Sequence, residues 1–155
     1  MREPSNQRRG ETHRGRKMKT IILYYSHSGN TKAIAEKKAA EVGADIEQIL
    51  EVKKPFVLAG IFRAWRRKKA NIQPIKAQLG NYDKIIIMSP VWGGYPVSAI
   101  NNAIELLPAG KQVEIVMVSA GGGTKASAEG TKALVTMRGC EVVGYSDVVA
   151  KRKSG

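Results

Sequence analysis

The sequence predicts an α/β protein built on a doubly wound parallel sheet. Short apolar runs alternate with stretches of helical spacing, and the segments between the runs have lengths suited to parallel crossovers. The composition agrees, because 43% of the 155 residues are hydrophobic and 25% are charged, as in a globular domain. We therefore expect one domain over residues 18–150, between basic tails at 1–17 and 151–155.

Five runs rich in apolar and β-branched residues are predicted to form the strands. An uninterrupted apolar run indicates a strand that is covered on both faces. The second run alternates between apolar and polar residues, which indicates a more lateral strand. The five runs span residues 21–25, 46–52, 85–88, 113–118 and 142–149.

Three helices are predicted between these strands. Residues 31–42 place apolar side chains on one side and precede Gly43, which is a helix stop signal. Pro96 is predicted to begin the next helix in its first turn, because apolar residues then recur at spacings of three and four. The third helix is expected over residues 125–137.

The net charge of +13 suggests an anionic partner, but its distribution weakens that interpretation. The excess lies in the two tails and in residues 53–69, which hold seven Lys/Arg and no acid. Within that segment, residues 55–69 have apolar side chains at helical spacing. They fit a crossover helix that covers the sheet, which we favour, or a basic helix that binds a membrane or an acidic partner.

The tails and the rare residues set further limits. Residues 1–17 contain no Val, Ile, Leu or aromatic residue, so we expect them to be disordered. Either Met18 is the natural start, or these residues form a real basic arm. No apolar run approaches the ~18 residues of a membrane-spanning helix. The single cysteine, Cys140, and the two histidines favour a cytoplasmic protein with neither a disulfide framework nor a metal site.

The loop after the first strand suits an anion. Hydroxyl groups can donate hydrogen bonds, Gly29 permits a tight turn, and the helix that follows adds free amides and a partial positive charge. The alternative is an ordinary turn in which Ser28 or Asn30 caps the helix. The loop consists of Ser26, His27, Ser28, Gly29, Asn30 and Thr31.

The loops after the third and fourth strands suit a planar ligand. In residues 89–96, Trp92 offers a flat face to a planar ring. The alternative is that Trp92 packs in the core or at an interface and contacts no ligand. Residues 119–124 include three glycines whose amides can face a ligand. Ligands of doubly wound sheets bind outside the carboxyl ends of the strands, where all three loops are expected.

The 119–124 loop also matches a weak dinucleotide fingerprint through Gly121, Gly123 and Ala126. Glu141 lies 20 residues after Gly121, at the spacing of a ribose-binding acid. We discount this match. Only one strand follows, which leaves no room for the second half of such a site.

The segment Leu23–Ala35 resembles the flavodoxin signature, in which a Ser/Thr-x-Ser/Thr-Gly-x-Thr loop joins a strand to a helix. Residues 89–96 are similar to the family's Trp-containing flavin loop, and the resemblance extends over nearly all of residues 18–149. It implies a flavodoxin-like five-stranded sheet of order 2-1-3-4-5 that binds flavin mononucleotide (FMN). The implied FMN contacts are Ser26, Ser28, Gly29, Asn30 and Thr31 at the phosphate, Pro90, Val91, Trp92 and Gly93 at the ring, and Ser119, Gly121, Gly122 and Gly123 at its polar edge. His27 is included with the phosphate loop, but it stands at the variable position of the motif, where we favour a loop residue that faces solvent.

The resemblance also implies a function. We expect a redox protein that transfers electrons to a partner protein or a small acceptor, with no specific nucleic acid. One alternative is a small NAD(P)H- or quinone-type reductase, since the third loop lacks an aromatic residue and leaves one flavin face more open. Another is a flavin-free basic module that binds nucleic acid, a membrane or an acidic partner. No nucleophile or acid–base pair is evident, so no catalytic residue is assigned.

Proteins of this family usually end with a fifth helix, which this sequence lacks after its last strand. One face of the sheet would then be under-covered. A second subunit, the tail residues or a further segment of a longer chain would cover it. An exposed apolar face favours association, so of these we expect a homodimer.

Overall fold

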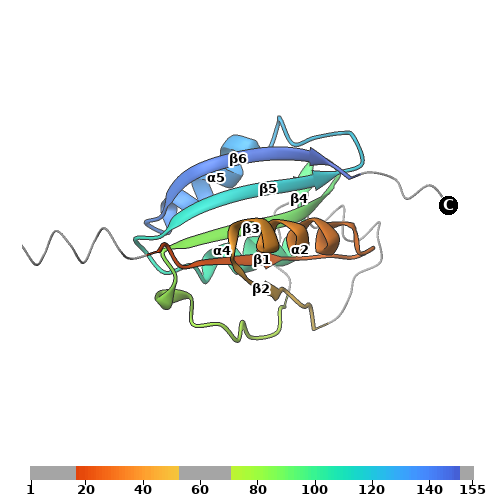
Figure 1. The fold of residues 1–155 in the computed structure, drawn as a ribbon. Helices are drawn as coiled ribbons and strands as arrows, with labels where there is room; N and C mark the ends of the chain where they lie inside the picture. Colours follow the sequence, from red (N-terminus) through yellow and green to blue (C-terminus); the bar gives the residue numbers. More distant parts are fainter. Residues whose placement is uncertain (1–16, 53–70, 151–155) are drawn as a thin grey trace, which may run out of the picture.

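Five parallel strands form the main sheet in a computed structural model, which describes residues 17–52 and 71–150 (Figure 1). Their order is β2-β1-β3-β5-β6, and neighbouring strands pair in parallel throughout. This confirms the predicted order 2-1-3-4-5. The strands are β1 (Thr20–Tyr24), β2 (Asp45–Gln48), β3 (Lys84–Trp92), β5 (Gln112–Ser119) and β6 (Glu141–Val149).

The continuous apolar runs put β1 and β3 at the centre of the sheet. Side chains from Ile21 to Leu23 and from Ile85 to Met88 are almost fully buried. Successive side chains of a strand point to opposite faces, so an unbroken aliphatic run requires cover on both. The two strands pair in register from Thr20 with Lys84 onward.

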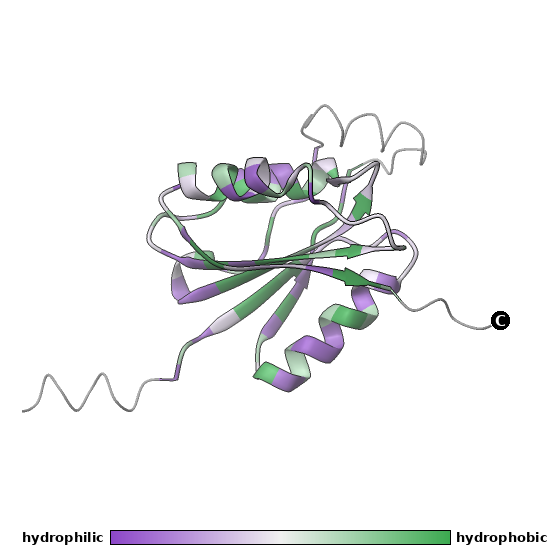
Figure 2. Ribbon diagram, turned by 90° about the horizontal axis from the view of Figure 1, so that it is seen from above, coloured by the Kyte–Doolittle hydropathy of each residue, from purple (hydrophilic) through white to green (hydrophobic). Residues whose placement is uncertain are grey.

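Helices supply that cover. α2 (Asn30–Val42) packs on one face through Ala35 and Ala39. α4 (Ser98–Glu105) and α5 (Ala128–Met137) pack on the other, and Figure 2 shows the sheet between the two helical layers. No helix within residues 17–52 and 71–150 has the length and hydropathy needed to cross a membrane.

The segment after β3 differs from the prediction. β3 continues to Trp92, and β4 (Tyr95–Pro96) turns back to pair with it in an antiparallel hairpin. Gly93 and Gly94 form the turn with φ angles of 63° and 84°, as a two-residue type I′ hairpin requires. Pro96 therefore lies in a sixth, two-residue strand, and the prediction that it begins a helix was wrong. Val97 caps the helix instead.

Other boundaries shift by a few residues. β2 ends at Gln48 rather than at Val52, since the chain then leaves the sheet and Glu51 forms an antiparallel bridge with Ile72. α5 begins three residues later than predicted, because residues 125–127 form a turn. A 3-10 turn, η1 (Leu79–Asn81), precedes β3. The expected helix at 55–69 and both predicted tails fall outside the described residues, apart from Lys17.

The face that carries α2 is only partly covered. Figure 1 shows α2 in front of β1 and β3, with no helix of the described residues in front of β5 and β6. A groove of about 370 Å³ runs between α2 and β6. Its lining includes Ile34 of α2 with Val148 and Val149 of β6, and Val149 is 61% exposed.

Candidate functional site

The loops after β1, β3 and β5 lie at one edge of the sheet, because these strands are parallel neighbours. The residues predicted to bind the cofactor lie in these loops or in the last residues of β3 and β5. Each of the three segments contains a buried serine, with 8% of Ser26, none of Ser89 and 5% of Ser119 exposed. The hydroxyl of each serine accepts a hydrogen bond from a backbone amide further along the chain.

The first loop wraps around the Ser26 hydroxyl. Its oxygen accepts hydrogen bonds from the amides of Gly29 at 3.1 Å and Lys32 at 3.3 Å. Gly29 is the N-cap of α2 with a φ of 94°, a left-handed conformation in which a side chain would be strained. Because Gly29 offers no capping side chain, the amides of the first helical turn can serve an anion.

The other residues of this loop differ in exposure. His27, Ser28 and Asn30 are exposed, whereas only 2% of Thr31 is exposed. Tyr24, just before the loop, has its pKa raised by burial and, to a smaller extent, by the charge of Glu36. Its phenol therefore stays neutral at physiological pH and adds no negative charge beside the loop.

Trp92 joins the first and second loops. Its ring lies edge-on to Tyr25, with the ring centroids 6.2 Å apart, and edge-on to His27 at 5.5 Å. Edge-to-face pairs of this kind are favourable arrangements of aromatic rings. Trp92 is half-buried, so part of its indole remains accessible at the site edge.

The second loop is the β3–β4 hairpin. The Ser89 hydroxyl donates to the carbonyl of Pro90 at 2.8 Å and accepts from the amide of Val97 at 3.1 Å, which binds both ends of the hairpin together. Pro90 and Val91 are half-buried and Gly93 is exposed. The two glycines let the hairpin reverse without side chains at its tip.

The third loop runs from Ser119 through three glycines. Gly121 donates its amide to the Ser119 hydroxyl at 3.3 Å and has a φ of 137°. Gly121 and Gly122 are exposed, and a Cβ atom on either would meet nothing within 4 Å. The open space beside these backbone atoms is what a flat ligand close to the amides requires.

Sequence reasoning missed the residues that fasten the third loop. Thr124, which is 1% exposed, hydrogen-bonds to Asp147 and Tyr145 of β6. Ser127 donates to the carbonyl of Gly94 at 2.6 Å and so reaches the hairpin turn. One signal in the sequence could have identified Asp147. It lies near the carboxyl end of the last strand, β6, which is the neighbour of β5, and the third loop follows β5.

The fingerprint acid Glu141 lies far from this edge. It is the first residue of β6 and pairs with Gln112, the first residue of β5, whereas the glycines follow the carboxyl end of β5. It therefore cannot contact a ligand at Gly121, which agrees with discounting that match.

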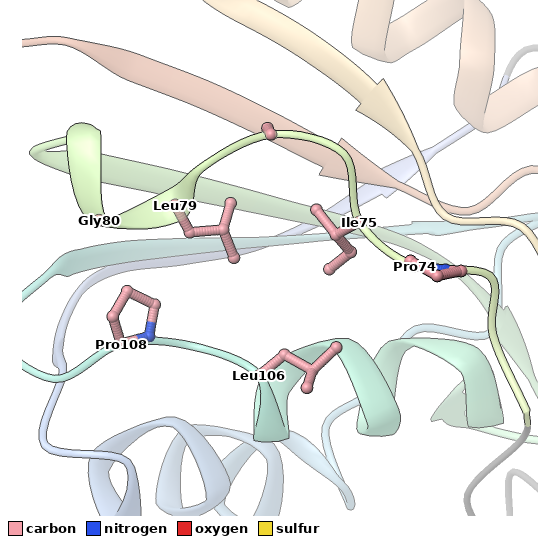
Figure 3. A pocket seen from close by; sticks show the side chains of 7 residues that line it. Pro74, Ile75, Leu79, Gly80, Leu106 and Pro108 are labelled. Atoms are coloured by element: carbon pink, nitrogen blue, oxygen red, sulfur yellow. The ribbon is translucent and has the colours of Figure 1, made fainter.

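An apolar groove also lies at the other edge of the sheet. Figure 3 shows Ile75 and Leu79, from the segment before β3, opposite Leu106 and Pro108 at the end of α4. The groove has a volume of about 520 Å³. Leu79 and Pro108 precede the first residues of β3 and β5, so the groove is at the amino edge and is separate from the three loops.

A family model described as NADPH-dependent FMN reductase matches residues 18–153, which is most of the chain. Among curated proteins, none matches. A flavoprotein from Lactobacillus acidophilus NCFM, solved in complex with FMN, is 29% identical, with a TM-score of 0.73 over 84% of this chain and 93% of that one.

Two flavodoxins share the fold at lower identity. Oxidised flavodoxin 1 from Bacillus cereus is 18% identical, with a TM-score of 0.54 over 88% of this chain and 87% of that one. Two-electron reduced flavodoxin from Megasphaera elsdenii is 19% identical, with a TM-score of 0.54 over 88% of this chain and 90% of that one.

Proposed function

The chain belongs to the NADPH-dependent FMN reductase family, and from this membership we propose that it is an oxidoreductase that takes electrons from a reduced nicotinamide. It is an FMN-binding flavoprotein with a flavodoxin-like fold. FMN supplies the redox chemistry when bound, since it can accept a hydride and release single electrons. The protein's own residues bind and orient it.

The first loop and the first turn of α2 are the proposed phosphate site. Thr31 and the exposed Ser28 and Asn30 contribute polar side chains, and the amides of the turn add donors at the positive end of the helix dipole. Ser26 serves mainly as the acceptor that shapes the loop, because two of the loop's amides already bind its oxygen. A phosphate monoester can be bound there without a cationic side chain.

The second and third loops are the proposed ring site. Pro90, Val91, Trp92 and Gly93 would line one side, and Ser119 with Gly121–Gly123 would present amides to the polar edge. The observation that carries the proposal is the meeting of these loops with the phosphate loop at one sheet edge. The third loop has only Ser, Ala, Gly and Thr, so this loop brings no aromatic ring to the second flavin face. That open face gives a nicotinamide access.

The visible absorbance spectrum of the purified protein, before and after FMN is added, tests the cofactor site. We expect flavin bands and saturable FMN binding. Changing Ser28 and Thr31 to Val should weaken FMN binding by tenfold or more, while riboflavin, which lacks the phosphate, should bind all the variants equally. A colourless protein that takes up no FMN would contradict the proposal.

Anaerobic mixing of the FMN-loaded protein with NADPH tests the electron donor. Bleaching of the flavin bands by NADPH alone would identify a reductase. Flavin that dithionite reduces but NADPH and NADH leave oxidised would instead identify an electron carrier that depends on a separate reductase. In that case we expect two redox partner proteins, one that donates electrons to the flavin and one that accepts them.

A further inference from the structure

The third loop is anchored at both ends by contacts that the FMN-binding residues do not explain. At its start, the amide of Ala150 donates to the Ser119 carbonyl at 2.8 Å. At its end, Thr124 is buried and bonds to two side chains of β6, Asp147 and Tyr145. We call Thr124, Tyr145 and Asp147 the Thr124 clamp.

Asp147 accepts two hydrogen bonds from Thr124. The Thr124 hydroxyl donates to Oδ1 at 2.6 Å, and its amide donates to Oδ2 at 3.3 Å. Because the hydroxyl proton is used there, the Tyr145 hydroxyl is the donor in its short contact with Thr124 Oγ1. Bonds to an ionised carboxylate are stronger than neutral ones, so this side chain fixes both the backbone and the rotamer of Thr124.

The clamp also reaches the second loop. The carbonyl of Thr124 accepts the amides of Ser127 at 3.0 Å and Ala128 at 2.9 Å, which sets the start of α5. The Ser127 hydroxyl donates to the carbonyl of Gly94 at 2.6 Å, in the hairpin turn beside Trp92. A continuous series of hydrogen bonds therefore runs from Asp147 through Thr124 and Ser127 to the hairpin.

We propose that Asp147 is a positioning residue for the flavin, which acts through Thr124 to hold the second and third loops in their binding conformation. This inference rests on the proposed function. A loop with three consecutive glycines loses more backbone entropy on ordering than most loops do. Each anchored end lowers the entropy cost that remains when the ligand binds. Without the clamp, FMN binding has to supply that order itself.

The test is FMN and riboflavin titration of the full chain and its variants, followed by quenching of flavin fluorescence. Asp147→Ala removes both acceptors and should weaken the binding of FMN and of riboflavin by roughly tenfold each. Asp147→Asn retains one acceptor and should give a smaller loss. Thr124→Val removes the hydroxyl but keeps the amide bond to Oδ2, so it should weaken the binding of both flavins, though less than Asp147→Ala. Thr124→Ser, which keeps the hydroxyl, should have near wild-type affinity.

Glu141→Gln is the matched control, since it removes an exposed acid from the other end of the same strand. Its affinity should equal that of the wild type, and an equal weakening would overturn the proposal. Wild-type affinity in Asp147→Ala and Thr124→Val, or equal weakening in Thr124→Ser and Thr124→Val, would also overturn it. Wild-type protein that binds neither flavin would refute the proposed function itself, so the two failures are distinguishable.

Discussion

Buried serines lie near the carboxyl ends of β1, β3 and β5, where the chain turns away from the sheet. A chain that leaves a strand at a buried position has amides without strand partners, and an unpaired buried amide costs about 1–3 kcal/mol. Ser26, Ser89 and Ser119 each accept one amide on a short side chain, and the amide bound by Ser89 belongs to the buried Val97. Each bond ties the following segment back to its own strand end.

Gly29 is the residue whose backbone conformation the phosphate loop depends on. Gly29→Ala should destabilise the fold by about 1 kcal/mol, because alanine is strained at a φ of 94° while the space for its methyl group is open. FMN binding should weaken as well, since relief of the strain would move the amides of the first helical turn. Urea unfolding and FMN titration measure the two effects.

Gly80→Ala is the control, because Gly80 also has open space for a Cβ atom but has no positive φ. It should leave both quantities close to those of the wild type. If both variants changed stability and FMN affinity equally, the cause would be the replacement of any glycine by alanine and not the left-handed conformation of Gly29.

At the scale of elements, Glu114 links α2 to the sheet. Its carboxylate bonds to Lys38 of α2 at 2.8 Å and to Lys84 of β3 at 2.9 Å, from a position on β5. Burial acts to raise the pKa of Glu114, but the hydrogen bonds and charges of the two lysines outweigh it and lower the pKa below its ordinary value of 4.5. The carboxylate is thus charged at neutral pH.

Glu114→Gln should therefore lose stability in a pH-dependent manner. A lowered pKa in the folded state means that the charged carboxylate stabilises the fold above pH 4.5 and that this contribution is lost as the pH falls through the folded-state pKa. The free energy of unfolding of the wild type should exceed that of the variant at pH 7, and the two should converge in acid. Urea unfolding across this pH range measures the difference.

Glu36→Gln is the corresponding control. Glu36 lies 3.9 Å from Lys32 in an exposed pair on the same helix, and exposed pairs contribute little. Its unfolding free energy should follow that of the wild type at each pH. If the wild type still had a larger free energy of unfolding than Glu114→Gln at low pH, the ion pairs would not be the source of the difference.

At the scale of the whole molecule, the excess positive charge lies outside the residues that the structure describes. The described residues, 17–52 and 71–150, hold eleven Lys/Arg and eleven Asp/Glu, so the net charge of +13 belongs to the remaining segments. The candidate FMN edge thus does not owe its anion affinity to excess basic side chains among the described residues. The backbone amides and hydroxyl groups of these loops are donors that need no excess of positive charge.

The groove between α2 and β6 is the proposed contact of a homodimer. Val149, 61% exposed, lines it together with Ile34 and Val148. Light scattering after size exclusion should give twice the chain mass, and Val149→Lys should shift the protein to monomer. Met137→Lys changes a residue 81% exposed on α5, on the opposite face, and should leave the mass unchanged. A monomer at high concentration would refute the dimer.

The pattern of residues was enough to predict where most of the strands and helices lie and which loops follow the strands, and the family resemblance implied the sheet order. Continuous apolar runs such as Ile85–Met88 predict strands that are buried on both faces. A glycine-rich turn between a strand and a helix can be recognised in the sequence, because few other residues adopt its φ angles. Parallel pairing then brings loops that follow neighbouring strands to one edge. These are local or topological properties, so a one-dimensional pattern carries them.

The β3–β4 hairpin, the late start of α5 and the Thr124 clamp were not predicted. Pro96 suits a helix start, but the local turn at Gly93 and Gly94 pairs it with Val91 in a strand. Asp147 has no local signal that links it to Thr124, 23 residues away, because their contact exists only once β6 lies beside β5. Contacts between side chains distant in sequence follow from packing, which no periodicity or motif in the chain records.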